Sequence, residues 1–167
     1  MNTSVINFDS RELRNAFGTF GTGVTVVTSR NMEGRLVGVT ANSFSSVSLE
    51  PPIVLWSLVK KSPSLDVFQE SGRFVINILS LDQIHLSKQF SSPIPDKFQN
   101  VQYRKGIDGL PVLSDCAGTI ECRVIKSIEA GDHIIFLGEV ENFSYEKKET
   151  LLYCNGAYAK SSVIQSN

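Results

Sequence analysis

The sequence lacks the features that define several large classes of protein. Nowhere do its 167 residues form an uninterrupted apolar run of about 18 residues, the length that a membrane span requires. The first residues, MNTSVINFDSRELR, contain no apolar core of a secretory signal. Lys and Arg occur at most in pairs, and the formal net charge is −1. The sequence therefore lacks the runs of basic residues that are typical of nucleic-acid-binding proteins. We therefore expect a cytoplasmic protein whose partners include neither a membrane nor a nucleic acid.

Cysteine and histidine are scarce as well. Cys116, Cys122 and Cys154 make an odd count without a CxxC pair. Cys116 and Cys122 fall in one predicted strand, about 20 Å apart at the usual rise per residue, too far for a disulfide or a shared metal. His85 and His133 alone are too few to complete a zinc site. We predict no metal site and treat the cysteines as small core residues.

The chain is long enough to fold without such support. A domain of this length buries about two-thirds of the surface that its unfolded chain exposes. We predict one domain over residues 1–167.

Short β-strands dominate the predicted secondary structure. Asp9 can cap a helix that runs to Phe20, whose apolar face should pack as a lid on the core. The β-branched run at 24–28 and the strand from 36 predict a β-hairpin. The run IVLWSLV at 53–59 is typical of a strand buried on both faces. Further strands are predicted at 74–79, 119–124, 133–145 and 151–158.

Two signals interrupt this β pattern. Ser80 and Gln83 form a capping box for a helix that ends near Phe90. A long polar connection follows at 91–109, and connections of this length are often functional lids. The pattern as a whole favours a mainly β fold, a β-barrel rather than a sandwich, with a few short helices.

The stretch RLVGVTANSFSSVS at 35–48 carries the first candidate site. It begins as a buried strand and ends as an uncharged polar loop, with Thr40, Asn42, Ser43, Ser45 and Ser46 interrupted only by Ala41 and Phe44. Small uncharged donors and acceptors beside one aromatic ring suit a flat neutral ligand that needs hydrogen bonds to its edge. The alternative is an ordinary serine-rich turn.

A second candidate site follows the apolar strand, in which Ser57 is the polar exception. Ser62 is placed to cap a helix with Pro63 in its first position, directly after Lys60 and Lys61. Free amide groups, the helix dipole, the ammonium groups and the hydroxyls of Ser62 and Ser64 would together suit a phosphate. The alternative is an ordinary capped helix with solvated lysines.

No nucleophilic constellation such as GxSxG is present, so a bound cofactor is expected to carry any chemistry. Seven segments resemble the flavin reductase-like, FMN-binding split-barrel family, the small reductase components of two-component monooxygenases. They are FGTFGTGVTVVT (17–28), GVTANSFSSVSLEPPIVL (38–55), KKSPSLDVF (60–68), FVINIL (74–79), KFQNV (97–101), GLPVL (109–113) and GDHIIFLGEV (131–140). They span nearly the whole chain in order.

The resemblance implies a Greek-key split β-barrel that binds FMN or FAD and uses NADH or NADPH. It implies that the flavin ring meets the polar loop at 40–46, and that the phosphate lies near Ser57, Lys61, Ser62 and Ser64. Phe90 is expected to border the flavin. His133 and Tyr158 are expected to position the nicotinamide, although His133 alone would suit a structural role at a strand end. No residue is expected to act as an acid or a base.

The leading hypothesis is therefore an NAD(P)H:flavin oxidoreductase that supplies reduced flavin to a separate oxygenase. The resemblance also implies a homodimer with the flavin near its interface. One alternative is a non-enzymatic FMN-binding electron carrier on the same barrel. Another is an enzyme similar to pyridoxamine-phosphate oxidase, although the basic substrate pocket of that reaction is not evident in the sequence.

Overall fold

The computed structural model describes residues 8–164 and is mainly β, with one large antiparallel sheet and few helices. The strands are β1 (Thr22–Gly23), β2 (Thr25–Arg30), β3 (Leu36–Ala41), β4 (Ser45–Leu49), β5 (Pro52–Val59), β6 (Arg73–Ile78), β7 (Tyr103–Lys105), β8 (Pro111–Leu113), β9 (Gly118–Ala130), β10 (His133–Tyr145), β11 (Leu151–Cys154) and β12 (Ala157–Lys160). The helices are α1 (Ser10–Gly18), α2 (Leu65–Ser71) and α3 (Ile84–Ser91), with 3-10 turns η1 (Leu81–Gln83) and η2 (Ile107–Gly109). Within residues 8–164, no helix has the length and apolarity of a membrane span.

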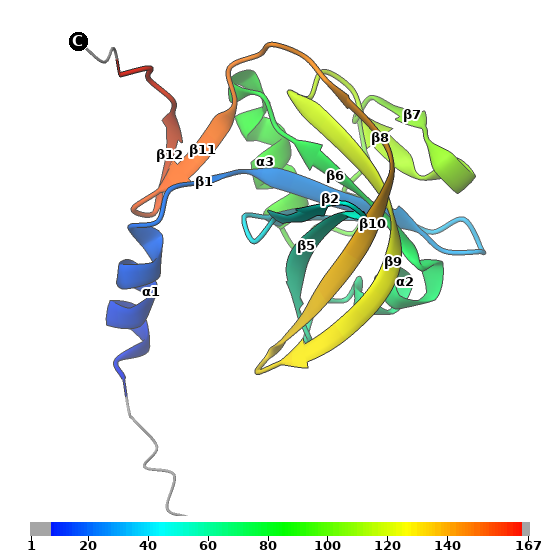
Figure 1. Ribbon diagram of the computed structural model, residues 1–167, viewed down its shortest axis with the longest axis horizontal. Helices are drawn as coiled ribbons and strands as arrows, with labels where there is room; N and C mark the ends of the chain where they lie inside the picture. The colour runs from blue at the N-terminus through cyan, green and yellow to red at the C-terminus, as the bar shows by residue number, and fades with distance from the viewer. Residues whose placement is uncertain (1–7, 165–167) are drawn as a thin grey trace, which may run out of the picture.

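The large sheet has the strand order β3-β2-β6-β9-β10-β5-β4, so β3 and β4 form its edges. The long strands β9 and β10 curve across the body, and α2 and α3 lie against the sheet (Figure 1). Strands β1, β11 and β12 make a separate small sheet that stands with α1 to one side of the body (Figure 1). The closing of the large sheet into a split barrel stays a prediction.

An aromatic cluster fills the space between the sheet and α2. The ring of Trp56 stacks on Phe136 at 5.1 Å between centroids and meets Phe68 edge-on at 4.9 Å. Strand β5 reaches this core with alternate residues only, because Val54, Trp56 and Leu58 are buried while their neighbours are half-buried or exposed. The prediction that this strand is buried on both faces is therefore wrong.

A second apolar cluster lies where α3 packs against β2 and β3. The predicted capping box at Ser80 and Gln83 is confirmed, with the Ser80 N–H donating to Gln83 Oε1 at 3.1 Å. It opens η1, which leads directly into α3. Phe90, near the end of α3, is only 1% exposed and belongs to this cluster.

Helix α1 forms where the sequence predicts it but not as a lid. Asp9 Oδ1 accepts hydrogen bonds from the N–H groups of Arg11 and Glu12, at 2.7 and 3.2 Å. No residue of α1 is buried, and Phe17 is 69% exposed. The helix points away from the body because β1, which follows it, pairs with β11 in the small sheet (Figure 1). The prediction that this helix packs on the core is wrong.

The cysteines are placed differently from the prediction in two respects. Cys154, at the end of β11, is half-buried and belongs to neither large apolar cluster, so the prediction that it is a core residue is wrong. Cys116 precedes β9 instead of sharing a strand with Cys122, because the strand begins only at Gly118. Cys116 and Cys122 are buried in separate apolar clusters, and this burial raises the pKa of both thiols to about 12.

Candidate functional site

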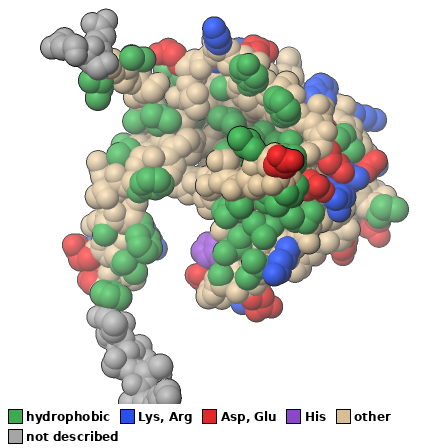
Figure 2. All heavy atoms as spheres, in the orientation of Figure 1, with side chains coloured by type: hydrophobic (Ala, Val, Ile, Leu, Met, Phe, Trp, Pro, Cys, Tyr) green, Lys and Arg blue, Asp and Glu red, His purple; other side chains and the backbone are tan. Residues whose placement is uncertain are grey.

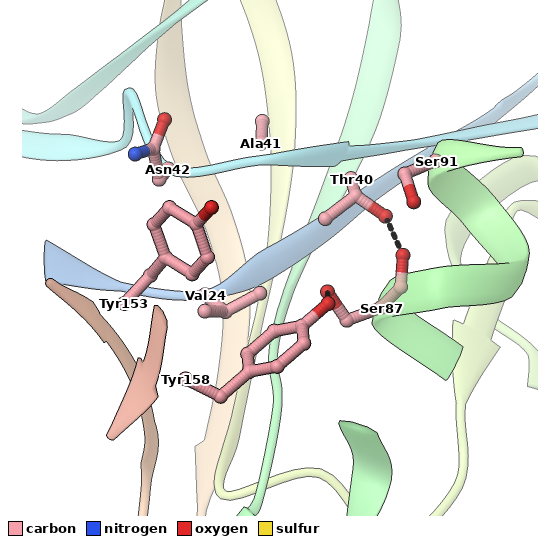
Figure 3. A pocket seen from close by; sticks show the side chains of 8 residues that line it. All are labelled: Val24, Thr40, Ala41, Asn42, Ser87, Ser91, Tyr153 and Tyr158. Carbon is pink, nitrogen blue, oxygen red and sulfur yellow. Dashed lines mark hydrogen bonds between the residues drawn. The ribbon is translucent and has the colours of Figure 1, made fainter. Parts of the chain in front are cut away.

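The end of β3 forms one wall of a cavity of about 250 Å³, drawn in Figure 3. None of its lining residues carries a charged side chain. These residues are Val24, Thr40, Ala41, Asn42, Ser87, Ser91, Tyr153 and Tyr158. Four of them, Thr40, Ala41, Asn42 and Tyr158, were predicted from the sequence as site residues. We call this space the ring cavity.

A short chain of hydrogen bonds holds the ring cavity in shape. Thr40 Oγ1 donates to the Ser87 carbonyl at 2.7 Å, which ties β3 to α3. The hydroxyls of Ser87 and Tyr158 share a hydrogen bond of 2.9 Å (Figure 3). Three elements that lie far apart in the sequence therefore meet at fixed positions around one uncharged space.

Two tyrosines form the opposite wall. Tyr153 and Tyr158 face each other across the β11–β12 hairpin, with ring centroids 5.6 Å apart at 73°. The turn between them, Asn155–Gly156, has positive φ angles at both residues, as two-residue hairpin turns require. Tyr153 was not predicted as a site residue, although this Asn-Gly turn places it directly opposite Tyr158.

A larger cavity of about 670 Å³ adjoins the ring cavity along β3. We call it the tail cavity. Its walls are the first half of β3, the start of α2 and the connection after α3, namely residues 35–38, 63–64 and 91–98. Ser91 lines both spaces, so the two cavities are neighbours along the edge strand, and we refer to them together as the groove.

The predicted phosphate cradle lies partly on this groove. Helix α2 begins at Leu65 with Ser64 as its N-cap, so the prediction that Ser62 caps it is wrong. Ser62 Oγ instead accepts a hydrogen bond from the Ser64 N–H at 3.3 Å, one step before the helix. Ser64 is buried in the wall of the tail cavity, whereas Lys61 is exposed and outside its lining.

Arg35 is a cation in this region that was not predicted as a site residue. It lines the tail cavity, donates to the Pro63 carbonyl and pairs with Asp66, both at 3.2 Å. No local motif predicts this role, because Arg35 and the α2 segment are far apart in the sequence and come together only in the folded chain.

The rest of the predicted loop divides between the scaffold and the surface. Ser43 Oγ accepts from the Ser57 N–H at 2.9 Å and donates to the Ser57 carbonyl at 3.1 Å. Phe44 packs against the aromatic core. Ser45 and Ser46 lie on β4, exposed and outside the linings of both cavities.

His133 and Phe90 also line neither cavity. His133 begins β10 opposite Val59, and its Nδ1 lies 2.7 Å from Asp132 Oδ1. This hydrogen bond lowers the pKa of the Asp132 carboxyl. Phe90 is buried, so it supports the groove from beneath. The functional roles of both residues stay predictions.

Residues 17–162 match the sequence model of the family described as flavin reductase like domain. The chain belongs to this family. It is 41% identical to the "FMN reductase (NADH) SmoA" of Agrobacterium fabrum, over 92% of this chain and 87% of that protein. The solved structure of "Flavin reductase PheA2 in native state" superposes with a TM-score of 0.86 at 40% identity, covering 93% of this chain and all of that one.

Other members of the family are longer. A "Probable flavin reductase" of Rhizobium meliloti is 47% identical over 90% of this chain, which covers only 49% of that protein. The reductase component of an Acinetobacter baylyi trigonelline monooxygenase is 42% identical over 91% of this chain, again 50% of that protein. The chain therefore spans about half the length of these two curated relatives.

Proposed function

We propose that this protein is an NAD(P)H:flavin oxidoreductase that supplies reduced FMN or FAD to a separate monooxygenase. The observation that carries the proposal is the groove beside β3, with an uncharged hydrogen-bonding wall facing two tyrosines, in a chain of the flavin reductase-like family. The relatives support it, since one is named an FMN reductase that uses NADH and another a monooxygenase reductase component.

The residues of the ring cavity fit a flavin ring. An isoalloxazine is flat and uncharged when oxidised, and hydroxyl and amide groups can hydrogen-bond to its edge while phenol rings contact its faces. When bound, the flavin accepts a hydride from the nicotinamide. Thr40 and Asn42 would orient the ring edge, and Tyr153 and Tyr158 would exclude water from it. We assign the flavin phosphate to the region of Lys61, Ser62 and Ser64.

We keep His133 as the residue that positions the nicotinamide. His133 pairs with Val59, the last residue of β5. The next residue, Lys60, donates its N–H to the Asp132 carbonyl at 2.8 Å. Hydride transfer requires the protein to align the donor with the acceptor, and it needs no acid or base from the protein. A solved relative from Streptomyces globisporus is described as an NADH:FAD oxidoreductase in complex with NAD and FAD fragments.

Flavin is proposed to leave as a product. The ring cavity offers neutral contacts, which are individually weak. NADH oxidation should rise with added FMN or FAD until it saturates, and reduced flavin should cross a dialysis membrane to reduce cytochrome c. Flavin that survives gel filtration, with NADH oxidation indifferent to added flavin, would contradict release. Flavin binding without any NADH oxidation would favour an electron carrier.

We also propose that the protein is a homodimer, in the cytoplasm. Apolar side chains of α1 and of the segment that follows it are open to solvent, because Phe17 on α1 is 69% exposed and Phe20 after it is 78% exposed. Figure 2 shows hydrophobic side chains gathered on the face of the body that carries β9 and β10, where Ile125 and Ile128 are exposed. A second copy could cover both surfaces, since soluble proteins rarely leave large apolar patches open.

Light scattering should then report twice the mass of one chain. Phe17→Asp should produce monomers because it places a charge in the apolar contact. Arg14→Asp on the same helix is the control. A wild-type monomer would refute the dimer without affecting the flavin assignment.

A further inference from the structure

The connection between α3 and β7 forms one wall of the tail cavity, and a lysine ties it in place. Its residues 91–98 line the cavity and are called the strap here. We infer that Lys97 is a positioning residue that holds the strap against β3 and α3 and so sets the shape of the flavin groove. This inference rests on the proposed flavin-binding function.

The side chain of Lys97 joins two elements at the groove. Its Nζ donates to the Phe90 carbonyl at 2.7 Å and lies 3.5 Å from the Gly38 carbonyl. The last carbonyls of a helix lack partners within the helix and carry its negative dipole end, so an ammonium group is favourable beside Phe90. Gly38 lies on β3, an edge strand of the large sheet. The ammonium group therefore bridges the end of α3 and the wall of the groove.

The charge of Lys97 serves the scaffold rather than a ligand. Lys97 is half-buried, and this partial withdrawal from water lowers the pKa of its ammonium group. Hydrogen bonds to a charged donor are stronger than neutral ones, so two carbonyl contacts hold the strap firmly. A phosphate-binding lysine would direct its donors into the cavity, whereas these two carbonyls take up two of the three N–H donors of Lys97.

Neighbouring contacts hold the strap in the same position. Gln89 Nε2 donates to the carbonyls of Lys97 and Gln99, at 2.9 and 3.0 Å. The ring of Phe98 meets Phe90 edge-on at 5.1 Å. The absence of a side chain at Gly38 makes room for Phe90, since a Cβ there would lie 2.4 Å from Phe90 Cε1. These contacts fix the C-terminal end of the strap, where Lys97 lies.

The test compares FMN with riboflavin, which lacks the phosphate, in the full-length chain. Lys97→Met should weaken both flavins by the same factor, about tenfold for the loss of a charged hydrogen bond. Hydrogen exchange of the strap should rise in the free protein while that of β9 and β10 stays unchanged. Lys88→Met, which removes the same charge from an exposed position on α3, should change neither quantity.

Loss of FMN affinity alone would identify Lys97 as a phosphate ligand and overturn the inference. Unchanged affinities and unchanged strap exchange would also overturn it. If Lys97→Met does not fold, Gln89→Met removes the second tie without altering charge and should give the same equal loss, whereas an unequal loss or none would contradict the strap's role. If the wild type binds neither flavin, the proposed function fails, while strap exchange still decides the structural role of Lys97.

Discussion

At the scale of single residues, the phosphate assignment depends on Lys61 and Ser62. Changing both to Ala should weaken FMN by about tenfold or more, because charged hydrogen bonds to the phosphate are lost. Riboflavin affinity should stay the same, since riboflavin carries no phosphate. Fluorescence titration measures both affinities.

Lys126→Ala is the matched control, because this lysine is exposed on β9 and lines neither cavity. An equal loss for FMN and riboflavin in the double variant would show that the phosphate lies elsewhere. Arg35, which lines the tail cavity, would then be the next candidate.

Asn42 tests the ring cavity. It is exposed at the cavity rim, so its loss should not disturb the core. Asn42→Ala should raise the dissociation constants of FMN and riboflavin alike, by about 0.5 to 1.5 kcal/mol for one neutral hydrogen bond. Unchanged titrations would remove this residue from the site.

At the scale of elements, α3 and β3 meet closely at Gly38. A Cβ at this position would lie 2.4 Å from Phe90 Cε1 and 2.5 Å from Cδ1, so Gly38→Ala must displace a buried ring. Overpacking of this kind costs about 1 to 3 kcal/mol of unfolding free energy. Urea denaturation measures this loss.

Gly23→Ala is the control for the same substitution in a strand, because an added Cβ there meets nothing within 4 Å. Equal stabilities of the two variants would contradict the close packing of α3 on β3.

The elements that the sequence predicts well are those with strong local signals. The β2–β3 hairpin follows from β-branched runs around a turn, the Ser80–Gln83 box from its spacing, and the strand from His133 to Tyr145 from the turn that precedes it. The lining of the candidate site could be predicted where its residues are consecutive, as in Thr40–Asn42. Ser87, Tyr153 and Arg35 could not, because they reach the groove only through tertiary packing.

The position of α1 shows the same limit. The spacing of its apolar residues predicts that Leu13 and Phe17 share a face, but this spacing does not predict which part of the molecule the face contacts. The short strand β1 decides this, because its pairing with β11 carries the helix away from the core. Ser62 is predicted as the cap of α2 because Pro63 suits the first position of a helix, but the helix begins only at Leu65.

At the scale of the whole molecule, burial should protect two of the three thiols. The pKa of Cys116 and Cys122 is raised to about 12 by burial, whereas Cys154 is half-buried. Since the thiolate is the reactive form, alkylation at pH 8 should modify Cys154 alone until the protein unfolds. Mass spectrometry of the labelled chain identifies the sites. Rapid native labelling of Cys122 would contradict the buried core.

The same two thiols predict how stability depends on alkaline pH. Their pKa is about 12 in the folded protein against 9.0 for an ordinary thiol, so unfolding releases protons between these values. Their contribution to stability is therefore complete below pH 9 and is lost as the pH rises towards 12. Denaturation of Cys116→Ala and Cys122→Ala variants across this window should show a shallower decline than the wild type. An equally steep decline would assign it to other groups.

The central claim is that flavin binds in the groove beside β3. Hydrogen exchange of the wild-type protein with and without FMN tests this most directly, because it locates binding along the whole chain. We predict that FMN slows exchange in the segments 38–46, 62–65 and 87–98 and leaves the β9–β10 turn at 129–133 unchanged in the absence of nicotinamide. Protection confined to segments outside the groove, or none at saturating FMN, would contradict the account.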